Sequence, residues 1–449
     1  MKKKILWILV CLFVIGFQFV ISAHSASLQT TIRIGLVRHF SNVESINIRN
    51  TTLIVGHGFG DDFIPSATLT SGSGFVIRRA SGNTIVQAGG STVFTFNPGQ
   101  PAQITAAGDE FIQMGTSSVF RGYMEFVGQG SLISAVNVLS MEEYLFGVLP
   151  AEMSPSFHPE ALKAQAVAAR TFAYNQMETG RHTGDGFDIC DSTHCQVFNG
   201  AGNEHENTNN AVMATAGLRL FYDGVPILAN FFSSSGGSTD NSEDVWFEAR
   251  PYLRSVNSAY EHEPMVWTRT FTWEQLTLAA NSAGANIGVV SGFSISRISV
   301  SGNALEITLH GSNGNHRVVR ESIRSFFGPI GGHLPSRAFT VAGAAAMSHG
   351  VTVADNTGSR DAVLNHLYTI DSNGVVTRIH LAYLSDGVIT RLINSIPAVF
   401  RGGSGITVNG RGHGHLVGMS QRGAEGMARA GYTFMEILKH YYTGVEVRH

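Results

Sequence analysis

Residues 141–153 read MEEYLFGVLPAEM, and the alanine-rich stretch ALKAQAVAART follows at residues 161–171. In and after this stretch, small or apolar side chains recur every three or four positions, which is the spacing of one helix face; they are Leu162, Ala166, Ala169, Ala173 and Met177. Pro159 suits the first position of a helix, and Gly180 suits its end. We therefore expect a helix from Pro159 to about Gly180, preceded by a Pro-x-Glu-Met turn that carries Glu152.

A helix rich in alanine can pack closely, so it would form a rigid support behind the carboxylate of Glu152. From spacing alone, a solvated loop acid is the simpler interpretation of this residue. The sequence pattern by itself leaves both interpretations open.

The rest of the chain predicts an α+β fold with more strand than helix. Short alternating runs between turn signals fill residues 30–113, and such runs are typical of strands. Later segments predict a helix at 208–216, a hairpin at 218–232, a helix at 274–283, strands at 295–300 and 305–309, and a strand-rich stretch at 346–400 that contains Asn373-Gly374. Thr433 and Glu436 form a capping box for a last helix.

We expect five segments along the chain. Residues 1–26 have three lysines, an apolar run and then small residues, which is the pattern of a secretory signal; an uncleaved anchor is the alternative. A β-rich region at 27–119 precedes a core at 120–260. A smaller inserted α/β and strand-rich region occupies 261–400, and 401–449 returns to complete the core.

Composition narrows the function classes. The chain has 449 residues, 30 Lys+Arg against 33 Asp+Glu, and a net charge of −3, which argues against electrostatic binding to nucleic acid or to an anionic membrane. Hydrophobic residues make up 43%, so a sizeable core is expected. Only 14% of residues are charged and 51 are glycine, which suits a turn-rich protein with an uncharged surface that meets sugars.

Five blocks, taken in order, resemble the SpoIID/LytB family of cell-wall proteins. The blocks are the Glu152 stretch with its helix, residues 191–200 (DSTHCQVFNG), residues 233–239 (SSSGGST), Val245-Trp246 with residues 251–256 (PYLRSV), and residues 410–424 (GRGHGHLVGMSQRGA). The resemblance covers about residues 120–447. It departs from the family pattern at His413, where Trp is usual, and at Leu416, where Gly is usual.

This resemblance implies an exported lytic transglycosylase that cleaves peptidoglycan glycan strands, in sporulation members strands stripped of stem peptides. The family's catalytic acid falls on Glu152. One carboxyl group suffices: it protonates the glycosidic oxygen and then removes the proton of the C6 hydroxyl, which closes a 1,6-anhydro ring without attack by water. The alternative is a non-catalytic enhancer that binds peptidoglycan and stimulates a cell-wall amidase. A zinc hydrolase is disfavoured because a closed Cys/His site has no open metal position.

Several further residues are candidates for glycan binding. Arg170 either orients Glu152 or binds substrate, or it forms a salt bridge elsewhere. Three further candidates for hydrogen bonds to sugars are Gln196, Ser235 and Tyr252. His415 matches the last block, and we expect the returning C-terminal segment to place it in the same groove as Glu152.

Four residues within 14 positions suggest a metal centre. His182, Cys190, His194 and Cys195 match the number and type of ligands in structural zinc sites, and some family members resemble this pattern and bind zinc there. A Cys190–Cys195 disulfide and two free thiols are the rival interpretations. No organic cofactor is expected.

Overall fold

The computed structural model describes residues 31–342, apart from 59–62, 99, 109–110 and 262, and residues 399–449; between 343 and 398 it describes only the backbone of short strands. The expected export segment at 1–26 and the Asn373-Gly374 turn lie outside the described residues. Among the described residues, no helix is both long and apolar enough to cross a membrane.

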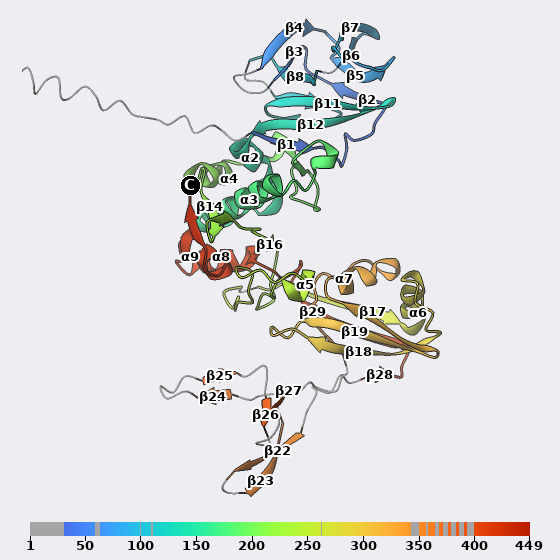
Figure 1. The fold of residues 1–449 in the computed structure, drawn as a ribbon, viewed down its shortest axis with the longest axis vertical. Coiled ribbons are helices and arrows are strands. Elements are labelled where there is room, and N and C mark those ends of the chain that lie inside the picture. The colour runs from blue at the N-terminus through green and yellow to red at the C-terminus, as the bar shows by residue number, and fades with distance from the viewer. Residues whose placement is uncertain are drawn as a thin grey trace, which may run out of the picture.

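The N-terminal part consists of two antiparallel-rich sheets that share one hydrophobic core (Figure 1). The first sheet has the order β13 (Ile189–Cys190), β1 (Thr31–Gly35), β12 (Leu132–Ser140), β11 (Tyr123–Gln129), β8 (Ala102–Ala106), β3 (Thr52–His57), β4 (Ile64–Thr70). The second has the order β10 (Ser118–Phe120), β9 (Ile112–Met114), β2 (Ser45–Ile48), β5 (Phe75–Ala80), β6 (Asn83–Ala88), β7 (Ser91–Thr95).

The first sheet crosses the boundary that we expected at residue 120. Strand β11 pairs with β8 from the N-terminal region, and β12 pairs with β1. Strand β1 also pairs in parallel with β13, which brings the Cys190 segment onto the edge of this sheet. The N-terminal strands therefore directly support the loop of residues 191–199, which is called the 190s loop below.

The helical layer beneath this sheet begins with α2 (Met141–Glu152). The Pro-x-Glu-Met segment is the last turn of this helix, not a separate turn before α3. Ser140 and Glu143 form a capping box at the start of α2. The sequence interpretation, which placed a turn at Pro-x-Glu-Met, did not use this signal. Pro150 lies inside this last turn, and the Met153 N–H bonds to the Leu149 carbonyl at the end of the helix.

Helix α3 (Pro159–Thr179) is confirmed as predicted, with Gly180 at its C-terminus in the left-handed conformation (φ 63°). It is the central helix of the core. It packs against α2, α4 (Glu206–Ala214), α8 (Gln421–Arg429) and α9 (Phe434–Tyr441). The alanines of α3 are fully buried, which is what lets four helices approach one helix closely.

The C-terminal segment returns to this core through two strand pairs and two helices. β30 (Met419–Ser420) pairs in parallel with β16 (Phe231–Phe232), and β31 (Glu446–Arg448) pairs with β14 (Arg219–Tyr222). β15 (Val225–Pro226) completes the β14 hairpin, and the Thr433 capping box is present at α9. Figure 1 shows the red C-terminal helices beside the green ones.

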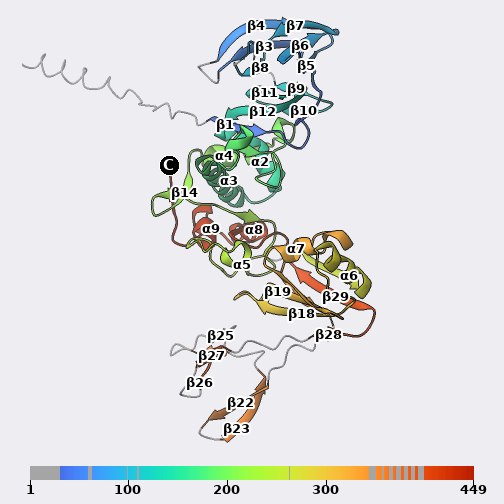
Figure 2. The same cartoon turned by 45° about the vertical axis from the view of Figure 1, so that its right-hand side comes forward.

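A second unit with its own hydrophobic core follows α5 (Glu243–Trp246) (Figure 2). One sheet has the order β17 (Val266–Thr272), β29 (Gly405–Arg411), β21 (Phe339–Val341); the other has β20 (Gly314–Val319), β19 (Ala304–Gly311), β18 (Val290–Ile298), β28 (Phe400–Arg401). Helices α6 (Trp273–Ser282) and α7 (Ser322–Phe326) complete this unit. Since β28 and β29 belong to it, the return to the core begins after Arg411.

Single turns of 3-10 helix occur at η2 (Thr183–Asp185), η3 (Gly200–Asn203) and η4 (Gly328–Ile330). Three antiparallel pairs lie in the 343–398 stretch: β22 (Gly350–Asp355) with β23 (Gly358–Val363), β24 (Tyr368–Ile370) with β25 (Val376–Arg378), and β26 (Tyr383–Ser385) with β27 (Thr390–Leu392). The whole chain is a mixed α/β protein with strand in excess, as the sequence predicts at that level.

Candidate active site and metal centre

Glu152 is the last residue of α2 and faces the loop that carries Val197. Its Oε1 accepts a hydrogen bond from the Val197 backbone N–H at 2.7 Å. The loop can come this close because position 147 is glycine: a Cβ there would lie 2.5 Å from the Phe198 ring. The carboxylate is thus fixed by a backbone donor and a close helix–loop contact, not left in solvent.

Burial raises the pKa of Glu152 above its ordinary value of 4.5, and the hydrogen bond from Val197 opposes this increase only in part. Desolvation penalises the charged carboxylate more than the neutral acid. A carboxyl group with a raised pKa keeps its proton to higher pH than an ordinary glutamate, which suits it to donate that proton to a leaving group.

The Glu152 side chain lines a pocket of about 500 Å³. The pocket joins α2, the 190s loop, the 228–231 segment, the α5 segment and the C-terminal return, and its lining residues are Glu152, Phe172, Arg181, Thr193, His194, Cys195, Val197, Leu228, Asn230, Phe231, Ser242, Trp246, Glu248, Arg250 and His415. Glu152 and His415, which are far apart in the sequence, therefore line the same pocket.

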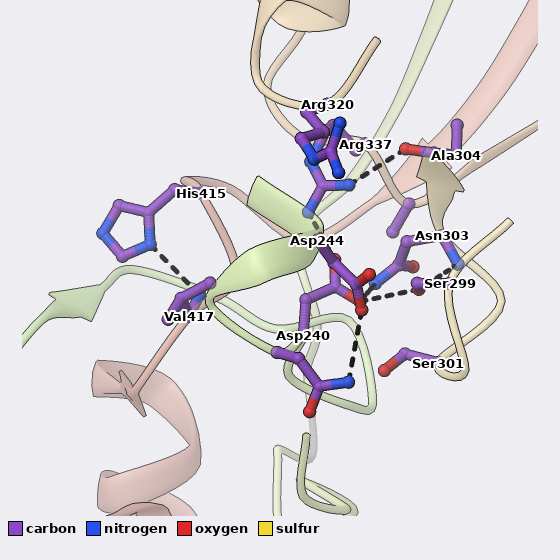
Figure 3. Close-up of polar contacts among 12 residues, drawn as sticks. Asp240, Asp244, Ser299, Ser301, Asn303, Ala304, Arg320, Arg337, His415 and Val417 are labelled. Atoms are coloured by element: carbon purple, nitrogen blue, oxygen red, sulfur yellow. Dashed lines mark hydrogen bonds and ion pairs between the residues drawn. The ribbon is translucent and has the colours of Figure 1, made fainter. Parts of the chain in front are cut away.

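His415 contributes a neutral ring to this pocket. Its Nδ1 accepts a hydrogen bond from the Val417 backbone N–H at 3.1 Å (Figure 3). Burial, and to a smaller extent the nearby charge of Arg324, lower the pKa of His415 to about 3. The ring centroid lies 4.9 Å from that of Trp246 and 5.4 Å from that of Phe232. The His415 ring is thus half-buried in an aromatic wall of the pocket.

Arg170 lies away from the pocket. Its side chain is fully buried; Nη2 forms an ion pair with Glu142 at 2.5 Å and also donates to the Val212 carbonyl, while Nη1 donates to the Leu218 carbonyl. This is the salt-bridge interpretation of Arg170, and it joins α3 to α2. A side chain with no exposed surface has no contact to offer a glycan.

The remaining three candidates for sugar contacts are also buried and do not line the pocket. Gln196 accepts from the Tyr144 hydroxyl at 2.9 Å and donates to the Ala169 carbonyl at 3.2 Å, so it ties the 190s loop to α2 and α3. Ser235 donates to Glu261 at 2.7 Å. The Tyr252 hydroxyl accepts from the Leu228 N–H and from Arg250.

Pocket residues that the sequence reasoning did not select include several from α5 and the loop after it. Trp246 lies in the quoted pair Val245-Trp246, but Glu248 and Arg250 fall between that pair and PYLRSV, and they form an ion pair at 2.8 Å. Arg181 was passed over because it precedes the metal-type cluster. The sequence signal that could have identified these pocket positions is an aromatic residue, Trp246, close to the charged residues Glu248 and Arg250.

The four predicted metal ligands do come together. Their candidate ligand atoms all lie within 4.8 Å of one another. His182 Nε2 is 3.2 Å from Cys195 Sγ, and His194 Nδ1 is 3.6 Å from Cys195 Sγ and 3.7 Å from Cys190 Sγ. Tetrahedral zinc with Zn–S of about 2.3 Å and Zn–N of about 2.0–2.1 Å separates its ligands by roughly 3.3–3.8 Å. The donor set therefore fits this ion.

Two further features of the cluster agree with a metal centre. His182 Nδ1 lies 2.7 Å from Asp185 Oδ2, and metal-bound histidines usually give their second ring nitrogen to such a carboxylate. No disulfide joins Cys190 to Cys195, and the contact between the two side chains lowers the pKa of Cys190 and raises that of Cys195. His194 and Cys195 also line the Glu152 pocket, so the cluster supports one of its walls.

Fold and site together define a mixed α/β protein whose pocket joins a desolvated carboxylate to a thiol–imidazole cluster. Residues 129–222 match the family described as SpoIID, stage II sporulation protein. The chain is 30% identical over 329 residues to stage II sporulation protein D of Bacillus subtilis (strain 168), which covers 70% of this chain and 76% of that protein. The chain belongs to the SpoIID/LytB family.

Two other relatives have similar identity. An uncharacterized protein of Brachyspira hyodysenteriae is 30% identical over 330 residues, or 73% of this chain and 72% of that protein. The amidase enhancer of Bacillus subtilis is 32% identical over 304 residues, which cover 67% of this chain and 39% of the enhancer.

Proposed function

We propose that this protein is an exported lytic transglycosylase that cleaves peptidoglycan glycan strands, with Glu152 as its acid and base. The observation that carries the proposal is the position of Glu152: a desolvated carboxyl group with a raised pKa, fixed by one backbone donor, at the wall of a 500 Å³ pocket. Such a group in a concave site is a candidate general acid.

The chemistry needs a single carboxyl group that changes its protonation state. Since Oε1 accepts the Val197 N–H, we assign the proton to Oε2. This proton passes to the glycosidic oxygen as the bond to the anomeric carbon breaks. The carboxylate then accepts the proton of the C6 hydroxyl while that oxygen bonds to the anomeric carbon, which restores the acid and closes the 1,6-anhydro ring. The Val197 N–H stabilises the charged intermediate state of Glu152.

A second acid, Glu248, also lines the pocket, so hydrolysis by a pair of carboxylates is the chemical competitor. Its side chain is 66% exposed and paired with Arg250, so it lacks the burial that distinguishes Glu152. Mass spectrometry of products from denuded glycan strands distinguishes the two: anhydro ends support transglycosylation, whereas reducing ends with added water contradict it.

An enhancer role without catalysis is the second candidate, because one relative is named an amidase enhancer. In that role the same pocket would bind glycan and present it to a cell-wall amidase. Adding this protein to a purified amidase and peptidoglycan tests this role. Faster amide cleavage that is unchanged by Glu152→Gln supports the enhancer, and anhydro products from this protein alone support the enzyme.

We further propose that His182, Cys190, His194 and Cys195 hold one structural zinc ion. All four positions would be filled by protein, so the ion would contribute to folding and to the shape of the pocket wall, not to the reaction. Peptidoglycan is the expected partner, outside the cytoplasm; no nucleic-acid partner and no organic cofactor are proposed.

If zinc is bound, protein purified without added metal should contain about one zinc per chain. Cys195→Ser should lower the melting temperature, because a closed site is folded only with its metal. Ser192→Ala is the matched control, since this neighbour contacts Cys190 Sγ but offers no ligand. A metal-free protein with a mass deficit of two hydrogens would instead establish a Cys190–Cys195 disulfide.

The raised pKa of Glu152 also sets a pH dependence. The first step needs the protonated acid, so kcat/KM should fall as the pH rises through the pKa of Glu152. Because burial raises that pKa, the fall should occur above pH 4.5, the ordinary glutamate value. Initial rates on denuded glycan across the pH range measure this, and a fall centred below 4.5 would contradict a desolvated acid.

A further inference from the structure

A strained aromatic pair forms one wall of the Glu152 pocket. Trp246 ends α5, lines the pocket and is 38% exposed. The next residue, Phe247, is 68% exposed and has φ 73°, a left-handed conformation that a bulky residue adopts only under strain. Such strain persists where surrounding contacts hold it, and it is concentrated at functional sites.

The contacts that hold this turn come from the second unit. The Arg320 guanidinium carbon lies 3.8 Å from the Phe247 ring centroid, which is a close cation–π contact. Arg320 Nε also donates to the Glu243 carbonyl at 2.9 Å. Arg320, which follows β20, therefore contacts both Glu243 at the start of α5 and Phe247 just after the end of α5.

The base of the same wall is joined to the second unit by a fully buried ion pair. Arg337 Nη2 lies 2.5 Å from Asp240 Oδ2, and neither side chain has exposed surface. Ser299 and Asn303 donate to the other oxygen of Asp240 at 2.7 and 3.1 Å. Figure 3 shows these residues around Asp240 with His415 and Val417 nearby.

The same segment is connected to the His415 wall through the backbone. Asp240 N–H donates to the Leu416 carbonyl at 2.7 Å, next to His415 in the chain. Breaking a buried pair leaves an uncompensated charge, so its geometry is strongly fixed. The second unit thus fixes the rings of Trp246 and His415 relative to each other.

We propose that Trp246 is the platform on which one sugar ring of the glycan stacks, and that Arg320 is the residue that positions it. This inference rests on the proposed glycan substrate. An indole face attracts the weakly positive C–H groups of a pyranose ring and releases water from both surfaces. The exposed part of Trp246 is not needed for core packing, whereas its contact with the neutral His415 ring at 4.9 Å keeps it from rotating away.

The platform is tested by binding, in protein that carries Glu152→Gln so that strands are not cleaved. The probe is a preparation of amidase-denuded glycan strands, and affinity is measured by calorimetry. Trp246→Ala should weaken binding about 30-fold, as for a buried aromatic anchor, and Trp246→Phe should recover most of the loss. The matched control is Trp273→Phe, since Trp273 belongs to the second unit and bonds to the Gly403 carbonyl outside the pocket. Unchanged affinity in Trp246→Ala would overturn the platform.

The role of Arg320 is tested by measuring KM and kcat separately, because a general loss of stability would not raise KM selectively. In active protein, Arg320→Gln should raise KM about 10-fold with kcat near normal, because a displaced Trp246 weakens substrate binding while Glu152 is unaffected. Arg317→Gln is the control, since this exposed arginine of β20 pairs only weakly with Glu306 at 3.8 Å. Equal KM values for both variants would overturn the positioning role.

These experiments distinguish failure of the Trp246 platform from failure of the proposed transglycosylase function. Wild-type protein that binds glycan through Trp246 but yields no anhydro products contradicts the transglycosylase and supports the platform. Anhydro products from the wild-type protein, together with undiminished glycan affinity in Trp246→Ala, support the transglycosylase and contradict the platform.

Discussion

Replacing Glu152 with glutamine is expected to reduce release of anhydro products about 10²–10⁴-fold, the usual contribution of a general acid–base group. Glutamine keeps the size of the side chain and can still accept the Val197 N–H through its amide oxygen. It has no proton to give to the glycosidic oxygen and cannot take one from the C6 hydroxyl. Product formation from denuded strands, followed by mass spectrometry, measures the loss.

Glu248→Gln is the matched control for this variant, because it makes the same chemical change in the other acid of the pocket. A transglycosylase should keep most of its activity in Glu248→Gln. Equal losses in both variants would indicate a two-carboxylate hydrolase, and wild-type turnover in a folded Glu152→Gln protein would end the catalytic assignment. Circular dichroism confirms that either variant is folded.

Deleting residues 412–449 is expected to abolish folding of the core, not to remove an appended module. The deletion takes away two helices, two strands and a set of fully or nearly fully buried side chains, which include Met419, Met427, Ile437, Leu438, Tyr441 and Tyr442. Truncating a single buried leucine costs about 2–5 kcal/mol, and a domain has only about 5–15 kcal/mol of stability. Loss of a cooperative thermal transition for the core is the expected measurement.

A finer version of this test uses one residue. Leu438→Ala should destabilise the protein by about 2–5 kcal/mol, while Lys439→Ala, at the neighbouring exposed position, should change stability little. Denaturant unfolding compares the two. A stable, glycan-cleaving fragment that ends at Arg411 would show that the C-terminal return is dispensable.

Local signals were sufficient for several elements. Helix α3 begins at Pro159 and ends before Gly180 as predicted, because a proline, a left-handed glycine and one regular apolar face all act within the helix itself. The capping box at Thr433 is likewise present. Family membership also came from sequence, since five ordered blocks are specific without any coordinates. Position 152 was selected in the same way.

Other features depend on contacts between distant segments. Sequence placed Arg170, Gln196, Ser235 and Tyr252 among candidates for glycan contacts, yet all four are buried within hydrogen-bond networks. A polar residue in a motif can serve either packing or binding, and only its exposure distinguishes the two. The same limit applied to Glu248 and Arg250, which lie between Val245-Trp246 and PYLRSV and become pocket residues through the course of the chain after α5.

The sequence by itself determined the family, the position of the candidate acid, the central helix and the four candidate metal ligands, because each is written in residue types at short spacing. Tertiary structure decided that Glu152 is desolvated, that His415 shares its pocket, and that Arg337 and Arg320 of the second unit support the Trp246 wall. Burial of Glu152 and its proximity to His415, some 260 residues away, arise only when the chain is folded. The pKa of a carboxyl group depends on which surfaces exclude water from it, and the folded chain alone defines those surfaces.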